Sequence, residues 1–213
     1  MKLTLPEELV LIAFDDQSGG GKARVGVDYA VAGLTLVELA VAGRVDVQED
    51  DAVTVLDARP TGTAFVDAEL AKIVEGDGAS MGKLLRRAHR SALNGAVESL
   101  VARGVLKREK GRAFGVLPVT RFPQADAAPE REIRDRLSAA VLQGEEPDER
   151  TAALVAVLNG ARLWGKAFPG QDRKQVKKRM DEISEGQWVG PVVRRAVRRT
   201  RAAILAASSG GGG

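Results

Sequence analysis

Apolar residues recur along most of the chain with helical spacing. Across residues 28–42 they cover much of the helix circumference, which predicts a helix buried on most sides. Across residues 80–103 they form one stripe, which predicts a long amphipathic helix with Ser80 as its N-cap and Gly104 at its end. The same spacing predicts helices near residues 5–15, 64–74, 129–143, 149–160, 171–184 and 191–207.

Other segments alternate with the period of two that is typical of strands. The expected strand pairs are 44–48 with 52–56 and 105–109 with 114–117. The turn of the second hairpin is expected at residues 110–113. Since no repeat or linker divides the chain, we predict a mainly α fold. It would be a single helical domain with two or more β-hairpins over residues 1–207, followed by a flexible Ser/Gly tail at 208–213.

Few residue types are available for chemistry. The chain has no cysteine, which excludes thiolate metal sites, thiol nucleophiles and disulfides. Its one histidine, His89, lies among arginines whose charge disfavours the imidazolium, so we expect a solvated helix residue rather than a catalytic base. The glycine-rich segment 17–22 lacks the Ser or Thr that follows Lys in a P-loop. These features predict a non-enzymatic protein without a metal or cofactor.

No element of the sequence is expected to hold the chain in a membrane permanently. Residues 1–8 lack the apolar core of a signal peptide, and no run of about 18 apolar residues occurs. Lys2 occupies the position at which N-myristoylation needs glycine. We therefore expect a cytoplasmic protein that associates with membranes only peripherally and reversibly.

Charge is distributed unevenly along the chain. Residues 1–80 carry six basic and fifteen acidic side chains, whereas residues 83–112 carry nine basic and two acidic ones. Residues 172–201 carry ten basic and four acidic side chains. Two basic blocks on an otherwise acidic chain favour an anionic partner: phospholipid, nucleic acid or acidic protein. The alternative is solubility combined with internal ion pairs to the acidic N-terminal third.

The first basic block contains the candidate binding residues. Lys83, Arg86, Arg87 and Arg90 are spaced i, i+3, i+4 and i+7, which places four cations on one helix face. Like charges so placed repel one another by a few tenths of a kcal/mol per pair, and guanidinium groups suit bidentate phosphate binding. The alternative is a solvated face that pairs with acidic N-terminal residues.

The second predicted hairpin combines basic and apolar side chains. Lys110 and Arg112 lie beside Phe114, so the hairpin could rest in the interfacial layer of a membrane. Equally, Phe114 could belong to the core or contact a neighbouring subunit. For the arginine-rich helix at 191–207, an exposed basic face opposite the core is the favoured interpretation.

Segments 3–13 (LTLPEELVLIA), 33–40 (GLTLVELA), 43–45 (GRV) and 100–106 (LVARGVL) together resemble the Golgi phosphoprotein 3 family. The composition is more similar to that of bacterial members. The resemblance implies a mainly helical domain without catalytic activity. Eukaryotic members bind phosphatidylinositol 4-phosphate and act as adaptors for the cytoplasmic tails of glycosyltransferases. In some members the hairpin mediates self-association, which makes Arg112 and Phe114 candidates for a homo-oligomer contact.

The resemblance also implies a head-group pocket built from a Trp, an Arg and two later basic residues. These four positions correspond to Ala23, Ala32, Arg90 and Leu93. Only Arg90 has the expected chemistry. Arg24, Arg86 and Arg87 are therefore the candidates to replace the missing side chains from neighbouring positions.

We therefore predict a peripheral membrane protein that binds anionic phospholipid through the stripe at 83–90 and the hairpin at 107–117. By the resemblance, the lipid would be phosphatidylinositol 4-phosphate and the role that of an adaptor. Two alternatives use the same basic surfaces. One is binding of acidic protein tails, and the other is nucleic-acid binding, which is disfavoured because no known motif for it is present.

Overall fold

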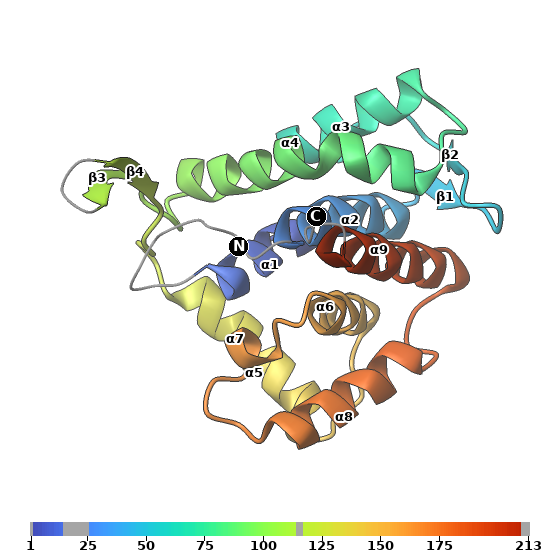
Figure 1. Cartoon of the computed structure of the whole chain (residues 1–213). Coiled ribbons are helices and arrows are strands. Elements are labelled where there is room, and N and C mark those ends of the chain that lie inside the picture. Colours follow the sequence, from blue (N-terminus) through green and yellow to red (C-terminus); the bar gives the residue numbers. More distant parts are fainter. Residues whose placement is uncertain (1, 15–25, 114–116, 210–213) are drawn as a thin grey trace.

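The computed structural model describes residues 2–14, 26–113 and 117–209; residues 1, 15–25, 114–116 and 210–213 lie outside the description. In this part of the chain the fold is mainly α with two small antiparallel hairpins, which confirms the predicted fold class (Figure 1). The helices are α1 (Leu5–Ala13), α2 (Val27–Val41), α3 (Ala64–Glu75), α4 (Met81–Ala102), α5 (Ala128–Val141), α6 (Glu149–Gly160), α7 (Trp164–Ala167), α8 (Arg173–Glu185) and α9 (Pro191–Ser209). The strands are β1 (Val45–Val47), β2 (Val53–Val55), β3 (Glu109–Ala113) and β4 (Leu117–Arg121).

Helix α2 lies at the centre of the core, between α4 and α9 (Figure 1). Ten of its fifteen residues are buried, as its nearly continuous apolar circumference predicts. Helix α4 is amphipathic instead. The side chain of Ser80 caps it by accepting a hydrogen bond from the backbone N–H of Lys83, and its N-terminal boundary is confirmed.

Polar groups buried at the start of α1 fix its position against α4. The carboxylate of Glu7 is fully buried and accepts hydrogen bonds from the backbone N–H and hydroxyl of Thr4 at 2.7 and 2.8 Å. From α4 it accepts the Ser99 hydroxyl at 2.7 Å, and it pairs with Arg103 at 3.0 Å. The Glu7 carboxylate therefore caps the N-terminus of α1 together with Thr4, and it joins α1 to residues more than 90 positions away in the sequence.

The two hairpins differ in how well the sequence predicts them. Strands β1 and β2 pair Val45 with Val55, within the predicted ranges. The second hairpin is displaced: β3 and β4 pair across residues 109–113 and 117–121, so the turn predicted at 110–113 is wrong and Lys110 and Arg112 belong to a strand. Proline has no backbone N–H to donate to a neighbouring strand. It is tolerated in β4 because both strands of a two-stranded hairpin are edge strands, and Pro118 lies opposite Arg112 of β3.

Asp57, just after β2, accepts hydrogen bonds from the backbone N–H and guanidinium of Arg59 and from Arg44. The Arg59 side-chain hydrogen bond is the main cause that lowers the pKa of Asp57 from 3.8 to about 2. Because the folded pKa is below the unfolded one, Asp57 contributes stability above pH 3.8 that is lost as the pH falls toward 2. An NMR titration should place the Asp57 midpoint near 2, and Arg59→Ala should raise it. A midpoint of 3.8 in the unchanged protein would contradict this assignment.

Candidate anion-binding surface

The four predicted cations on α4 are exposed, and we call Lys83, Arg86, Arg87 and Arg90 the α4 stripe. Leu84 and Leu85 are buried on the other side of the helix, which forces the basic positions outward. Within residues 2–14, 26–113 and 117–209, no carboxylate lies within ion-pair distance of any of the four. The alternative of neutralisation by the acidic N-terminal third is thus not seen in the described residues.

His89 lies beside the α4 stripe but is not solvated as expected. Its ring stacks on Tyr29 of α2 with the centroids 4.7 Å apart, and only 20% of its side chain is exposed. Its Nδ1 lies 3.0 Å from the carbonyl oxygen of Arg86, and its Nε2 lies 3.7 Å from the carboxylate of Asp28. The expectation fails because the start of α2 covers this position. The ring ties α2 to α4.

On one side of the stripe, Arg86 faces a hollow between α2, α4 and α9, which we call the α9 hollow. Its volume is about 420 Å³, and its wall includes Tyr29 and several alanines of α9. Arg199 enters it from α9, pairs with Asp51 at 3.1 Å and donates to the carbonyl oxygen of Glu49. Two guanidinium groups meet one carboxylate, so the α9 hollow carries a net positive charge.

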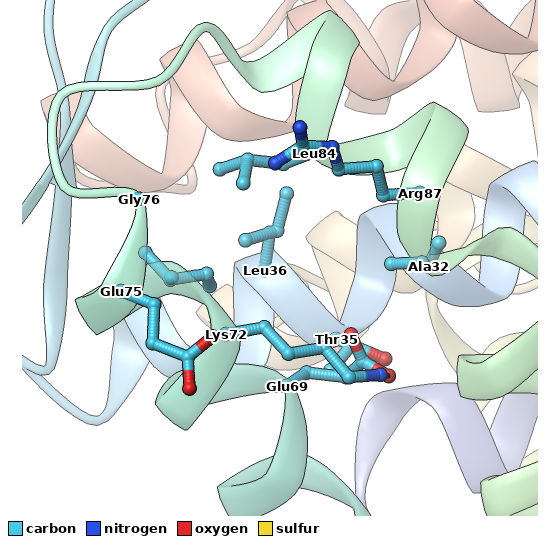
Figure 2. A pocket seen from close by; sticks show the side chains of 11 residues that line it. Ala32, Thr35, Leu36, Glu69, Lys72, Glu75, Gly76, Leu84 and Arg87 are labelled. Atoms are coloured by element: carbon cyan, nitrogen blue, oxygen red, sulfur yellow. Dashed lines mark hydrogen bonds and ion pairs between the residues drawn. The ribbon is translucent and has the colours of Figure 1, made fainter.

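On the other side of the stripe, Arg87 reaches over a hollow between α2, α3 and α4, the α3 hollow (Figure 2). Its volume is about 300 Å³ and its wall is largely apolar, with Ala32 in α2. Lys72 pairs with the buried carboxylate of Glu69 at 2.8 Å, and Glu75 is a second acidic residue in the lining. In the α3 hollow two cations are balanced by two carboxylates. The α9 hollow, with its net positive charge, is therefore the better site for an anion.

The positions implied by the family resemblance are only partly brought together. Ala32 is buried in the wall of the α3 hollow, Leu93 packs against the core, and Arg90 is exposed on α4. Ala23 and the candidate Arg24 lie outside the described residues.

Arg86 and Arg87 enter the two hollows that flank the stripe. Sequence reasoning did not identify Arg199 or Tyr29 as lining residues. Arg199 belongs to a basic helix face that was noted, but its place opposite Arg86 follows only from the packing of α9 against α2.

Helix α9 does not present its basic face freely. Arg195 pairs with Asp46 of β1 at 3.0 Å, and Arg198 lies 3.7 Å from Glu49 in the turn of the first hairpin. Together with the Arg199 pair, these contacts hold the acidic turn against α9. The exposed basic face expected for this helix is thus partly neutralised by residues about 150 positions away.

The second hairpin projects beyond the helices at the C-terminal end of α4 (Figure 1). Lys110 is exposed on β3, whereas Phe114 and the side chain of Arg112 lie outside the description. Arg108 pairs with Glu98 and lies 5.9 Å from the centroid of the Phe122 ring. Membrane or subunit contact by this hairpin stays a prediction.

The described residues offer neither a metal site nor a membrane-spanning helix. They contain no group of three or more histidine, aspartate and glutamate side chains placed to hold a metal ion. Their helices include none with the length and apolar character needed to cross a bilayer.

No curated protein matches the sequence. The model of the family described as Golgi phosphoprotein 3 (GPP34) matches residues 5–200, which is nearly the whole chain. The resemblance predicted from the four sequence segments is confirmed, and the chain belongs to the Golgi phosphoprotein 3 family.

Proposed function

We propose that this protein binds anionic phospholipid reversibly at membrane surfaces, with the α4 stripe as its main contact. The observation that carries the proposal is the stripe itself: four exposed cations on one helix face, without a carboxylate partner in the described part of the chain. A basic residue near an anionic leaflet contributes about 1 kcal/mol, so the stripe would supply about 4 kcal/mol. Attachment of that strength is reversible and sensitive to salt.

The α9 hollow supports a place for one lipid head group beside the stripe. Arg86 and Arg199 enter it from two different helices, and guanidinium groups bind phosphate oxygens in a bidentate geometry. Family membership supports the finer proposal that the head group is phosphatidylinositol 4-phosphate. Ala32, where the family resemblance expects the arginine of the head-group pocket, lies in the wall of the α3 hollow. In the α9 hollow the cation would therefore come from Arg86.

Replacing Arg86 and Arg90 together by alanine is expected to weaken binding to anionic vesicles by about 30-fold. The loss of two contacts of about 1 kcal/mol each gives this factor. Co-sedimentation with neutral, generally anionic and phosphatidylinositol 4-phosphate vesicles, at low and physiological salt, measures it. A double change of Lys174 and Lys178 to alanine removes the same charge from exposed positions on α8 and is expected to have little effect.

The lipid dependence separates the two levels of the proposal. Binding that requires the phosphoinositide would support a specific head-group site in the α9 hollow, whereas binding to any anionic vesicle would support the stripe alone. Equal losses in the two double variants would refute a specific role of the stripe. No binding to any vesicle would refute the membrane proposal, and competition with duplex DNA or acidic peptides would then identify the partner of the stripe.

A further inference from the structure

A third hollow lies between α6, α7, α8 and α9. Helices α8 and α4 lie on opposite sides of α9 (Figure 1). We call this third hollow the α8 hollow; its volume is about 610 Å³. Its lining contains a tryptophan, four cations and one carboxylate. These residues are Trp164, Arg162, Arg173, Lys177, Arg201 and Asp181.

The one carboxylate in the lining is already engaged. Asp181 accepts hydrogen bonds from Lys177 at 2.7 Å and from the Asn159 amide at 2.8 Å. The Lys177 hydrogen bond is the main cause that lowers the pKa of Asp181, which therefore stays ionised and paired. Within residues 2–14, 26–113 and 117–209, neither Arg173 nor Arg201 forms an ion pair with a carboxylate, although the charge of Arg201 also helps to lower the pKa of Asp181. The hollow thus keeps an excess of positive charge.

Packing orients both of these arginines. The guanidinium carbon of Arg173 lies 3.9 Å from the centroid of the Trp164 ring. Stacking uses the face of the guanidinium and leaves its in-plane N–H groups available as donors. Arg201 lies close to Gly160 of α6, where a Cβ would come within 2.8 Å of its Cγ. A glycine therefore lets the stem of Arg201 cross the α6 backbone into the hollow.

We propose that the α8 hollow binds a small phosphate-bearing anion, with Arg173 and Arg201 donating to its oxygens. The excess charge selects an anion, and two planar donor groups from different helices suit the tetrahedral oxygens of phosphate. The phosphate could belong to a soluble compound or to a lipid head group, because the hollow opens at the surface beside Leu205, which is 57% exposed. This site does not depend on the α4 stripe.

Trp164 provides a direct reporter of binding. The chain has two tryptophans, so Trp188→Phe leaves Trp164 as the only one. Titration of this variant with pyrophosphate at constant ionic strength is expected to give a saturable change in Trp164 fluorescence. Isothermal calorimetry on the unchanged protein makes the same test without that substitution. No saturable signal in either measurement would overturn the proposal.

Arg201→Ala in the same background leaves the Arg173–Trp164 stack in place and is expected to weaken pyrophosphate binding about tenfold or more. Arg201→Lys keeps the charge without the planar fork and should recover part of the affinity. The matched control is Arg198→Ala on the same helix, which lies outside the hollow and is 63% exposed. Unchanged affinity in Arg201→Ala, or an equal loss in the control, would overturn the site.

Two further measurements are needed. Other ligands identify the source of the phosphate, and the α4 stripe variant separates this site from the proposed membrane contact. A response to glycerol 3-phosphate supports a soluble ligand, and a response to phosphatidic acid vesicles supports a lipid ligand. The Arg86→Ala/Arg90→Ala variant should keep the full pyrophosphate response even where it loses vesicle binding. If it loses the pyrophosphate response as well, an independent site in the α8 hollow is refuted.

Discussion

Replacing Glu7 with alanine is expected to lower the free energy of unfolding by about 3 kcal/mol. The Glu7 carboxylate is fully buried, and its loss would leave the Thr4 N–H, the Ser99 hydroxyl and the Arg103 guanidinium without this acceptor. Removing one partner of a buried ion pair typically costs about 3–5 kcal/mol. The lower end applies because 24% of the Arg103 side chain is exposed and can be partly solvated.

Denaturant unfolding monitored by circular dichroism measures this loss. Glu7→Gln keeps the size and one acceptor oxygen but loses the charge, so it should lose less stability than Glu7→Ala. Glu98→Ala is the control on α4, since its side chain is 56% exposed and pairs only at the surface with Arg108. That change should cost less than about 1 kcal/mol. A Glu7→Ala protein as stable as the control would refute the role of this carboxylate.

The other acidic residues of the family-like segments also hold the fold together. Glu38 of α2 accepts the backbone N–H of Leu5 at 2.8 Å and pairs with Arg150 of α6 at 2.8 Å. Glu8 is buried and pairs with Arg136 of α5. Burial is the largest influence on the pKa of Glu8 and raises it, even though both arginines lower it. The residues that carry the resemblance therefore report on the fold, and the candidate ligand residues lie elsewhere.

The spacing of apolar residues was sufficient to predict the helices that pack their apolar side chains into the core. The bounds of α2 and α4 agree with the sequence to within about one residue, because an apolar circumference and a Ser80 cap are local signals. Helix α7 was missed, since four residues are too few to show a period. The register of the second hairpin was predicted wrongly because proline usually ends a strand, so the predicted strand stopped before Pro118, whereas β4 continues through it.

The candidate site was predictable only in part. The spacing of the α4 stripe identifies four cations on one face, but it cannot say which neighbours each will meet. Arg86 and Arg87 are adjacent in sequence and enter different hollows, because α9 lies on one side of α4 and α3 on the other. The stack of His89 on Tyr29 likewise depends on how α2 crosses α4. These contacts follow from tertiary packing, which a local pattern does not encode.

Gly33, in one of the family-like segments, allows α2 and α9 to approach closely. A Cβ at this position would lie 2.5 Å from Oγ1 and 2.8 Å from Cβ of Thr200, and still closer to its Cγ2. Both residues are buried, so neither helix can relieve the overlap by turning a side chain into solvent. Gly33→Ala is therefore expected to lower the free energy of unfolding by about 3 kcal/mol, although alanine normally favours a helix.

A double-mutant cycle identifies the cause of that loss. Thr200→Ala removes Oγ1 and Cγ2, the two closest atoms, and leaves its own Cβ, so it should restore part of the stability of Gly33→Ala. Gly165→Ala is the control, because a Cβ there meets no atom within 4 Å and should be neutral or slightly stabilising. Additive losses in the double variant would show that Thr200 is not the obstacle. The close approach of α2 and α9 would then not be the reason for glycine at position 33.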